Sequence, residues 1–137
     1  MFELAGMAFF VVLGKDSKLR AFHNICRHRA YTVVRKTTGT SNQLHCKYHG
    51  WSYSTEGKLV KAPKFEEMPG FRFEDNGLFE VKLISTAEGL LFVNFDSGTR
   101  DIPFVGFKLS IPTRDLHSTV TSVSVDTTLN WKVIGKL

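Results

Sequence analysis

Two cysteines and three of the five histidines lie in one stretch of the chain, CRHRAYTVVRKTTGTSNQLHCKYHGW, residues 26–51. Cys26 and His28 stand one residue apart, and Cys46 and His49 form a second pair with two residues between them. Both cysteines of the chain are used in these two pairs. Because thiolates and imidazoles are the ligands that proteins offer to zinc and iron, this spacing predicts a metal site.

Two kinds of metal centre fit four such ligands. A zinc finger usually groups Cys with Cys and His with His, whereas each pair here offers one of each. Mixed pairs fit a [2Fe–2S] cluster in which one iron takes two thiolates and the other takes two imidazoles. Neutral imidazoles leave the cluster less negative, so its potential rises to roughly −150 to +300 mV. A structural zinc module that binds other proteins is the alternative.

Side chains beside the four ligands are candidates for tuning this centre. A glycine next to a ligand lets backbone N–H groups approach the sulfurs, and a tryptophan either shields the centre from water or packs in the core. Basic side chains near both pairs would attract an acidic protein or an anionic substrate. The residues expected around the site are Arg27, Arg29, Lys47, Tyr48, Gly50 and Trp51, with Arg35 and Lys36 nearby.

Length and composition indicate one ordinary domain. The chain has 137 residues, 42% of them hydrophobic, and a formal net charge of +5. Basic and aromatic residues do not interleave in a nucleic-acid-binding pattern, so we expect no nucleic acid partner. Glu3 and the lack of a basic start argue against a secretory signal, and the apolar run 7–13 is too short for a membrane span. We therefore expect an intracellular protein, cytoplasmic or organellar, with cysteines free to bind metal.

Short apolar segments separated by turn residues dominate the pattern, so the sequence predicts an all-β fold. Gly57 supplies the positive φ that a tight hairpin turn requires. The segment 62–71 has two prolines and predicts a loop with one helical turn. The expected strands are residues 8–13, 19–23, 33–35, 43–45, 51–54, 59–61, 80–84 and 90–95, followed by a longer, half-buried strand at 119–131.

Four segments resemble the N-terminal part of Rieske non-haem iron oxygenases, specifically the α subunits of the ring-hydroxylating and choline-monooxygenase-like groups. The segments are NICRHRA, CKYHGWSYSTEGKLVKAP, GLLFVNFD and DTTLNWKV. The resemblance implies the Rieske fold, an antiparallel β-sandwich with an inserted two-loop cluster-binding subdomain, here about residues 23–63. It implies that Cys26 and Cys46 hold one iron of a [2Fe–2S] cluster and that His28 and His49 hold the other. One departure is Lys47, where the family usually has proline.

The resemblance also implies that the chain serves a larger enzyme. Residues 1–131 would be the Rieske domain, and 132–137 the start of a catalytic domain whose mononuclear iron site, two histidines and a carboxylate, is missing here. The remaining histidines, His23, His45 and His117, have no suitable spacing for that site. The chain alone would carry electrons but hydroxylate nothing, and we expect a shortened chain to associate with itself.

In such enzymes a reductase or ferredoxin donates electrons, and the Rieske domain passes them to the mononuclear iron. The electrons serve hydroxylation of an aromatic ring or oxidation of a quaternary amine. Members often assemble as trimers, so the resemblance implies a homo-oligomer. A stand-alone Rieske ferredoxin is a second reading, although these ferredoxins are typically shorter.

Overall fold

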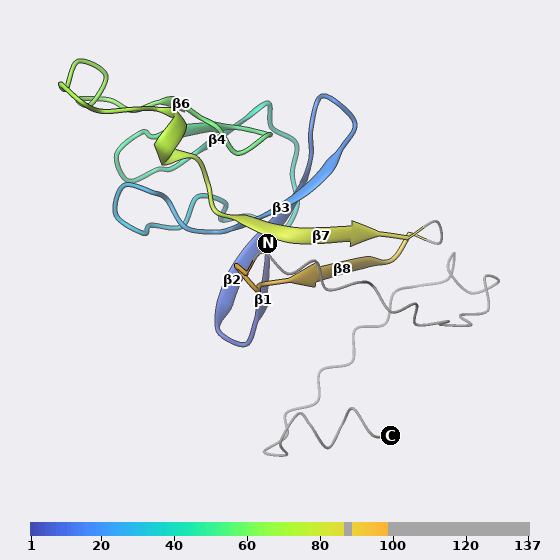
Figure 1. Cartoon of the computed structure of the whole chain (residues 1–137). Coiled ribbons are helices and arrows are strands. Elements are labelled where there is room, and N and C mark those ends of the chain that lie inside the picture. Colours follow the sequence, from blue (N-terminus) through green and yellow to red (C-terminus); the bar gives the residue numbers. More distant parts are fainter. Residues whose placement is uncertain (87–88, 99–137) are drawn as a thin grey trace, which may run out of the picture. The chain divides into compact units, whose positions relative to one another are not determined.

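The computed structural model describes residues 1–86 and 89–98 of the chain (Figure 1). They belong to one compact unit, Met1–Asp101. The predicted strand 119–131, the boundary at residue 131, the segment 132–137 and His117 all lie outside the described residues. Within the described part of the chain, no helix has the length and apolar character needed to cross a membrane.

The described residues form two antiparallel sheets, which confirms the expected all-β class. The larger sheet has the strand order β1-β2-β3-β7-β8, and the smaller has the order β4-β5-β6. The smaller sheet is inserted between β3 and β7, as Figure 1 shows. The elements are β1 (Phe2–Leu4), β2 (Met7–Leu13), β3 (Leu19–His23), β4 (Gln43–His45), β5 (Ser52–Ser54), β6 (Leu59–Lys61), the 3-10 helix η1 (Glu74–Asn76), β7 (Glu80–Ser85) and β8 (Leu91–Asn94).

Three local expectations differ from the structure. The expected strand at residues 33–35 is absent, and β4 pairs with β5, where Leu44 lies opposite Tyr53. Strand β1 was not expected from the sequence, and it pairs antiparallel with β2. The segment 62–71 contains turns only, and the short helix comes later, at η1.

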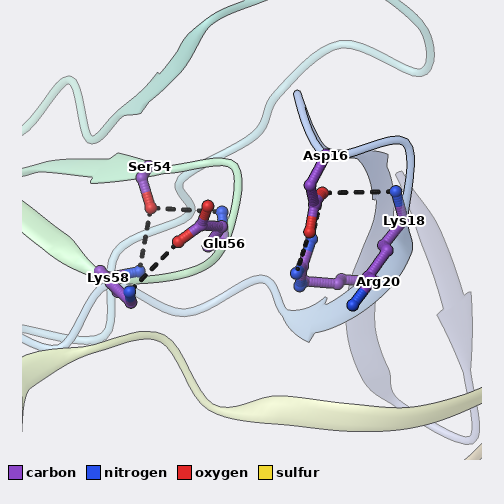
Figure 2. Close-up of polar contacts among 6 residues, drawn as sticks. All are labelled: Asp16, Lys18, Arg20, Ser54, Glu56 and Lys58. Carbon is purple, nitrogen blue, oxygen red and sulfur yellow. Dashed lines mark hydrogen bonds and ion pairs between the residues drawn. The ribbon is translucent and has the colours of Figure 1, made fainter.

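Two hairpin turns are fixed by their own side chains, as Figure 2 shows. Between β2 and β3, Asp16 accepts a hydrogen bond from the N–H of Lys18 and pairs with Arg20 at 2.6 Å. Between β5 and β6, Ser54 Oγ accepts hydrogen bonds from the backbone N–H groups two and four residues further on, at 3.2 and 3.3 Å. Gly57 in that turn has φ +83°, so the positive φ expected from the sequence is confirmed.

The core lies on both faces of the larger sheet. Neighbouring residues of a strand point to opposite faces, and Phe9 and Phe10 on β2 accordingly enter two different clusters. The cluster around Phe10 also contains both cysteines and the fully buried Tyr53. The predicted ligands are therefore built onto the same core that joins the smaller sheet to the larger one.

Candidate metal centre

Two short loops carry the predicted ligands. We call them the first finger, Cys26–Tyr31, and the second finger, Cys46–Trp51. In each, the cysteine N–H donates to the carbonyl oxygen five residues further on, at 2.8 Å in both fingers. The cysteine carbonyl accepts from the N–H four residues further on, at 2.9 Å in the first and 3.1 Å in the second. That fourth residue has a positive φ in both, 53° at Ala30 and 75° at Gly50, so the fingers share one backbone turn.

The two histidines meet although they stand at different positions in the shared turn. His28 comes two residues after its cysteine, and His49 comes three residues after its own. Their ring centroids are 4.6 Å apart with the planes inclined by 69°. His28 is half-buried, whereas His49 is exposed. The fingers therefore present an imidazole pair with one sheltered and one accessible ring.

The two cysteines form the matching sulfur pair. Both side chains are free thiols, each in a residue only 2% exposed. Burial raises the pKa of the Cys46 thiol, and the neighbouring Cys26 thiol adds to the rise. Hydrogen bonds from the backbone N–H groups of Tyr48 and His49 act in the opposite direction. The sulfurs thus lie together in a dry site, with backbone donors directed at one of them, and a bound metal would favour their thiolate form.

Tyr53 is a further contact of the site, and the sequence analysis did not identify it. Its hydroxyl accepts a hydrogen bond from the N–H of Arg27 at 3.0 Å and lies 3.2 Å from the Cys26 sulfur. Because the oxygen already accepts from Arg27, its own proton is available to the sulfur. Burial raises the pKa of Tyr53 well above its usual range, so the hydroxyl stays protonated. In the sequence, the only indication of this contact was that Tyr53 stands two residues beyond the second finger, on the strand that became β5.

Aromatic rings enclose the first imidazole. The indole of Trp51 stacks on His28 at 5.0 Å with an interplanar angle of 8°, and the ring of Phe65 meets the same imidazole edge-on at 5.2 Å. Trp51 is 2% exposed and belongs to the core cluster around Phe10, so its expected core packing is observed, and its shielding of the centre stays a prediction. Phe65 was not expected from the sequence.

Within this enclosure, His28 Nδ1 is buried and has no hydrogen-bond partner among the described residues, and the same holds for Trp51 Nε1. Burial lowers the pKa of His28, and the nearby His49 and Arg29 lower it further. These effects favour the neutral form of the imidazole. A buried, neutral imidazole nitrogen without a partner is what a metal ligand requires.

The basic side chains near the fingers divide into two roles. Arg29 and Lys47 are exposed beside the predicted ligands. Arg27 instead turns back to the larger body of the domain: its guanidinium carbon lies 3.9 Å from the centre of the Phe79 ring, and its Nη2 donates to the Asp75 carbonyl at 3.2 Å. Arg27 therefore secures the first finger, and Arg29 and Lys47 are the exposed cations beside the predicted ligands.

The exposed rings of Tyr31, in the first finger, and Tyr48, in the second, come together with centroids 5.1 Å apart. His45 and His23 lie outside the ligand pairs. His45 is exposed on β4 and its Nδ1 lies 2.8 Å from Ser52 Oγ, whereas His23 contacts the ring of Phe95.

The four predicted donors suit a two-iron group better than a single metal ion. Among residues 1–86 and 89–98, no three His, Cys, Asp or Glu side chains lie close enough together to hold a single metal ion. The predicted ligands meet as a sulfur pair and an imidazole pair, and one imidazole nitrogen is buried without a partner. This set of residues fits a [2Fe–2S] cluster with uneven ligation.

Comparison with known proteins gives the same assignment. Residues 1–72, more than half of the chain, match the family model of the Rieske [2Fe–2S] domain. The biphenyl 2,3-dioxygenase subunit alpha of Rhodococcus jostii is 42% identical over 94 residues, which cover 67% of this chain and 20% of that protein. The carnitine monooxygenase oxygenase subunit of Acinetobacter baumannii is 30% identical over 139 residues, covering 96% of this chain and 37% of the relative.

Solved structures show the same likeness. The quaternary ammonium Rieske monooxygenase CntA in complex with L-carnitine superimposes with a TM-score of 0.67 at 28% identity, covering 72% of this chain and 28% of that one. Naphthalene 1,2-dioxygenase with indole bound gives a TM-score of 0.61 at 31% identity, covering 66% and 21%. The chain spans between about a fifth and just over a third of the length of these curated relatives. On its fold, its paired donors and these matches, the chain belongs to the Rieske [2Fe–2S] domain family and is related to the α subunits of Rieske oxygenases.

Proposed function

We propose that Cys26 and Cys46 hold one iron of the [2Fe–2S] cluster, that His28 and His49 hold the other, and that the domain carries single electrons inside a Rieske-type oxygenase. The observation that carries the proposal is the meeting of a buried sulfur pair and an imidazole pair from two fingers with one backbone turn. When bound, the cluster supplies a one-electron carrier whose potential is raised by its two neutral ligands.

The protein's own groups tune that carrier. Reduction adds negative charge, so hydrogen bonds to the sulfurs favour the reduced form. The Tyr53 hydroxyl is placed to donate to Cys26, and the backbone N–H groups of Tyr48 and His49 donate toward Cys46. Trp51 and Phe65 exclude water from the His28 side of the centre. The hydrogen bonds would raise the potential, whereas the exclusion of water opposes them because it disfavours the more negative reduced form.

The exposed side of the centre is the proposed route for electrons. His49 is the accessible ligand, and the exposed side chains of Tyr48, Lys47 and Arg29 lie in or beside the two fingers. Two cations beside an exposed ligand attract an acidic surface and orient it before contact. We propose a reductase or ferredoxin with such a surface as the electron donor.

The proposed acceptor is a mononuclear non-haem iron in a catalytic domain of the same assembly, which uses the electrons for hydroxylation or monooxygenation of a substrate. The relatives named above are a dioxygenase subunit and the oxygenase subunit of a monooxygenase, and both reaction types need this delivery. A homo-oligomer, a trimer as is common in the family, belongs to the same proposal.

The proposal is tested by purifying the full chain without oxygen after supplying iron and sulfide. We expect a red-brown protein with two irons and two sulfides per chain that dithionite reduces by one electron. A colourless protein that holds one zinc would overturn the electron-carrier account and favour the structural zinc module.

The proposed attraction between the exposed cations and an acidic electron donor has its own test. Reduction by an acidic ferredoxin should slow as salt is added, because the attraction is screened. A rate independent of salt would contradict it.

A further inference from the structure

The two fingers are closed at their bases in different ways. The second finger grows out of a strand pair, since β4 and β5 pair antiparallel up to His45 and Ser52, the residues that flank it. The first finger begins at Cys26, separated from the end of β3 by two residues, and returns through residues 32–35, which form no strand. Backbone pairing therefore closes the second finger but not the first.

A single side chain takes the place of that pairing. Asn24 Oδ1 accepts hydrogen bonds from the N–H of Val33 at 3.1 Å and from the N–H of Val34 at 2.8 Å. Its Nδ2 donates to the Val34 carbonyl at 2.7 Å. Asn24 is 3% exposed, and both ends of its amide are used. The two bonds to Val34 resemble what a neighbouring strand offers to one residue, and the bond to Val33 adds a third contact.

Asn24 is itself held by the larger sheet. Its backbone N–H donates to the carbonyl of Ala8 on β2 at 2.8 Å, and the preceding His23 N–H donates to the Phe79 carbonyl at 2.9 Å. Val33, on the far side of the finger, is buried in the core cluster that contains Cys26. One residue thus connects the sheet to both ends of the segment that carries Cys26 and His28.

We propose that Asn24 is a positioning residue for the metal centre, which fixes the first finger so that Cys26 and His28 face their counterparts. The second finger does not depend on it, because strand pairing supports that finger. The redox consequence of this proposal rests on the proposed function, whereas the control of the first finger is a property of the chain itself.

Hydrogen exchange of the full chain, measured by mass spectrometry with and without the cluster, tests the control of the first finger. In Asn24→Ala, two buried N–H groups lose their acceptor, so we expect exchange at residues 33–34 to accelerate by roughly 10- to 100-fold. Exchange at residues 44–53 should stay unchanged. Asn24→Asp keeps the acceptor oxygens but loses the donor to Val34, and we expect an intermediate acceleration. This second variant covers the case in which Asn24→Ala does not fold.

Val81→Ala is the matched control, because Val81 is 1% exposed and lies in the core cluster on the opposite face of the larger sheet. Its cavity lowers global stability, so exchange should accelerate alike in both fingers. If Asn24→Ala gave the same uniform acceleration, Asn24 would be an ordinary core residue and the proposal would be overturned.

The reduction potential gives a second readout. We expect both Asn24 variants to shift the midpoint potential of the bound cluster and Val81→Ala to leave it unchanged, since only the former move a ligand pair. An unchanged potential in both Asn24 variants would overturn the positioning role. A wild-type chain that takes up no cluster would refute the proposed function instead, and the exchange measurement would still decide whether Asn24 holds the first finger.

Discussion

The first and second fingers have the same backbone turn, and the structure supports them differently. Side chains hold the first finger in place: Asn24 closes its base, Tyr53 contacts its sulfur, and Arg27 contacts the ring of Phe79. Backbone groups hold the second finger, through the β4–β5 pairing and through N–H groups directed at Cys46. Substitutions at the supporting side chains Asn24, Tyr53 and Arg27 should therefore disturb the first finger more than the second.

The position of the histidine also differs between the fingers. Within one turn, an offset of two residues directs His28 inward against Trp51, and an offset of three leaves His49 exposed. Two fingers with the same backbone turn thus present one sheltered and one accessible imidazole. For an electron carrier this separates two tasks, exclusion of water and contact with a partner.

The largest difference is expected at the last residue of each finger. Trp51 is 2% exposed and Tyr31 is 37% exposed. Trp51→Ala leaves a cavity, so we expect the free energy of unfolding to fall by about 3–5 kcal/mol, whereas Tyr31→Ala should cost less than about 1 kcal/mol. Urea unfolding followed by circular dichroism measures both. Equal losses at the two positions would show that the fingers are supported alike.

Tyr53→Phe should affect the first finger alone. Removing the hydroxyl takes the acceptor from the Arg27 N–H and the donor from Cys26, so we expect a loss of about 1–3 kcal/mol in stability. The midpoint potential should fall by on the order of 50 mV, since the reduced centre loses a hydrogen bond. Tyr48→Phe, at an exposed tyrosine of the second finger, is the control and should leave the potential unchanged. Equal potentials in all three proteins would rule out a hydrogen bond from Tyr53 to the sulfur.

Ala30 and Gly50 have a positive φ at the same position of the shared turn, so exchanging the two residue types between these positions compares the fingers. Gly50→Ala would place a Cβ 3.5 Å from Pro63, an ordinary contact, so its cost comes from φ +75° and should be about 1–2 kcal/mol. Ala30→Gly relieves that strain but frees the unfolded chain by about 0.4–1 kcal/mol, and we expect a net change below about 1 kcal/mol. Thermal unfolding of the two variants compares them. A stable Gly50→Ala would mean that the second turn tolerates side chains as well as the first.

The smallest effect is expected at a turn outside both fingers. Hydrogen bonds and the charge of Arg20 hold the pKa of Asp16 well below its usual range (Figure 2). Asp16 is then more acidic in the folded chain, so its contribution is present at neutral pH and lost as pH falls below about 4. Asp16→Asn should lower the melting temperature slightly at pH 7 and progressively less in acid, with no change in the visible spectrum. A constant difference across pH would contradict the ion pair.

Much of the candidate site could be predicted because its signals are local. The spacing of the four predicted ligands, the positive φ at Gly57 and the apolar run of β2 can all be read within a few residues. The roles of Asn24 and Tyr53 could not, because they depend on contacts between residues 9 to 27 positions apart. The strand expected at 33–35 failed for a related reason, since the Asn24 side chain occupies the N–H groups of Val33 and Val34.

The central claim, that each finger gives one sulfur and one imidazole to an unevenly ligated cluster, is tested most directly by pulsed electron paramagnetic resonance. The dithionite-reduced full chain would be labelled with 15N-histidine. The account predicts two distinct, strongly coupled histidine nitrogens in the wild type, one of which disappears in His28→Cys and the other in His49→Cys. A reduced centre without histidine coupling, or a chain that binds zinc and gives no signal, would contradict it.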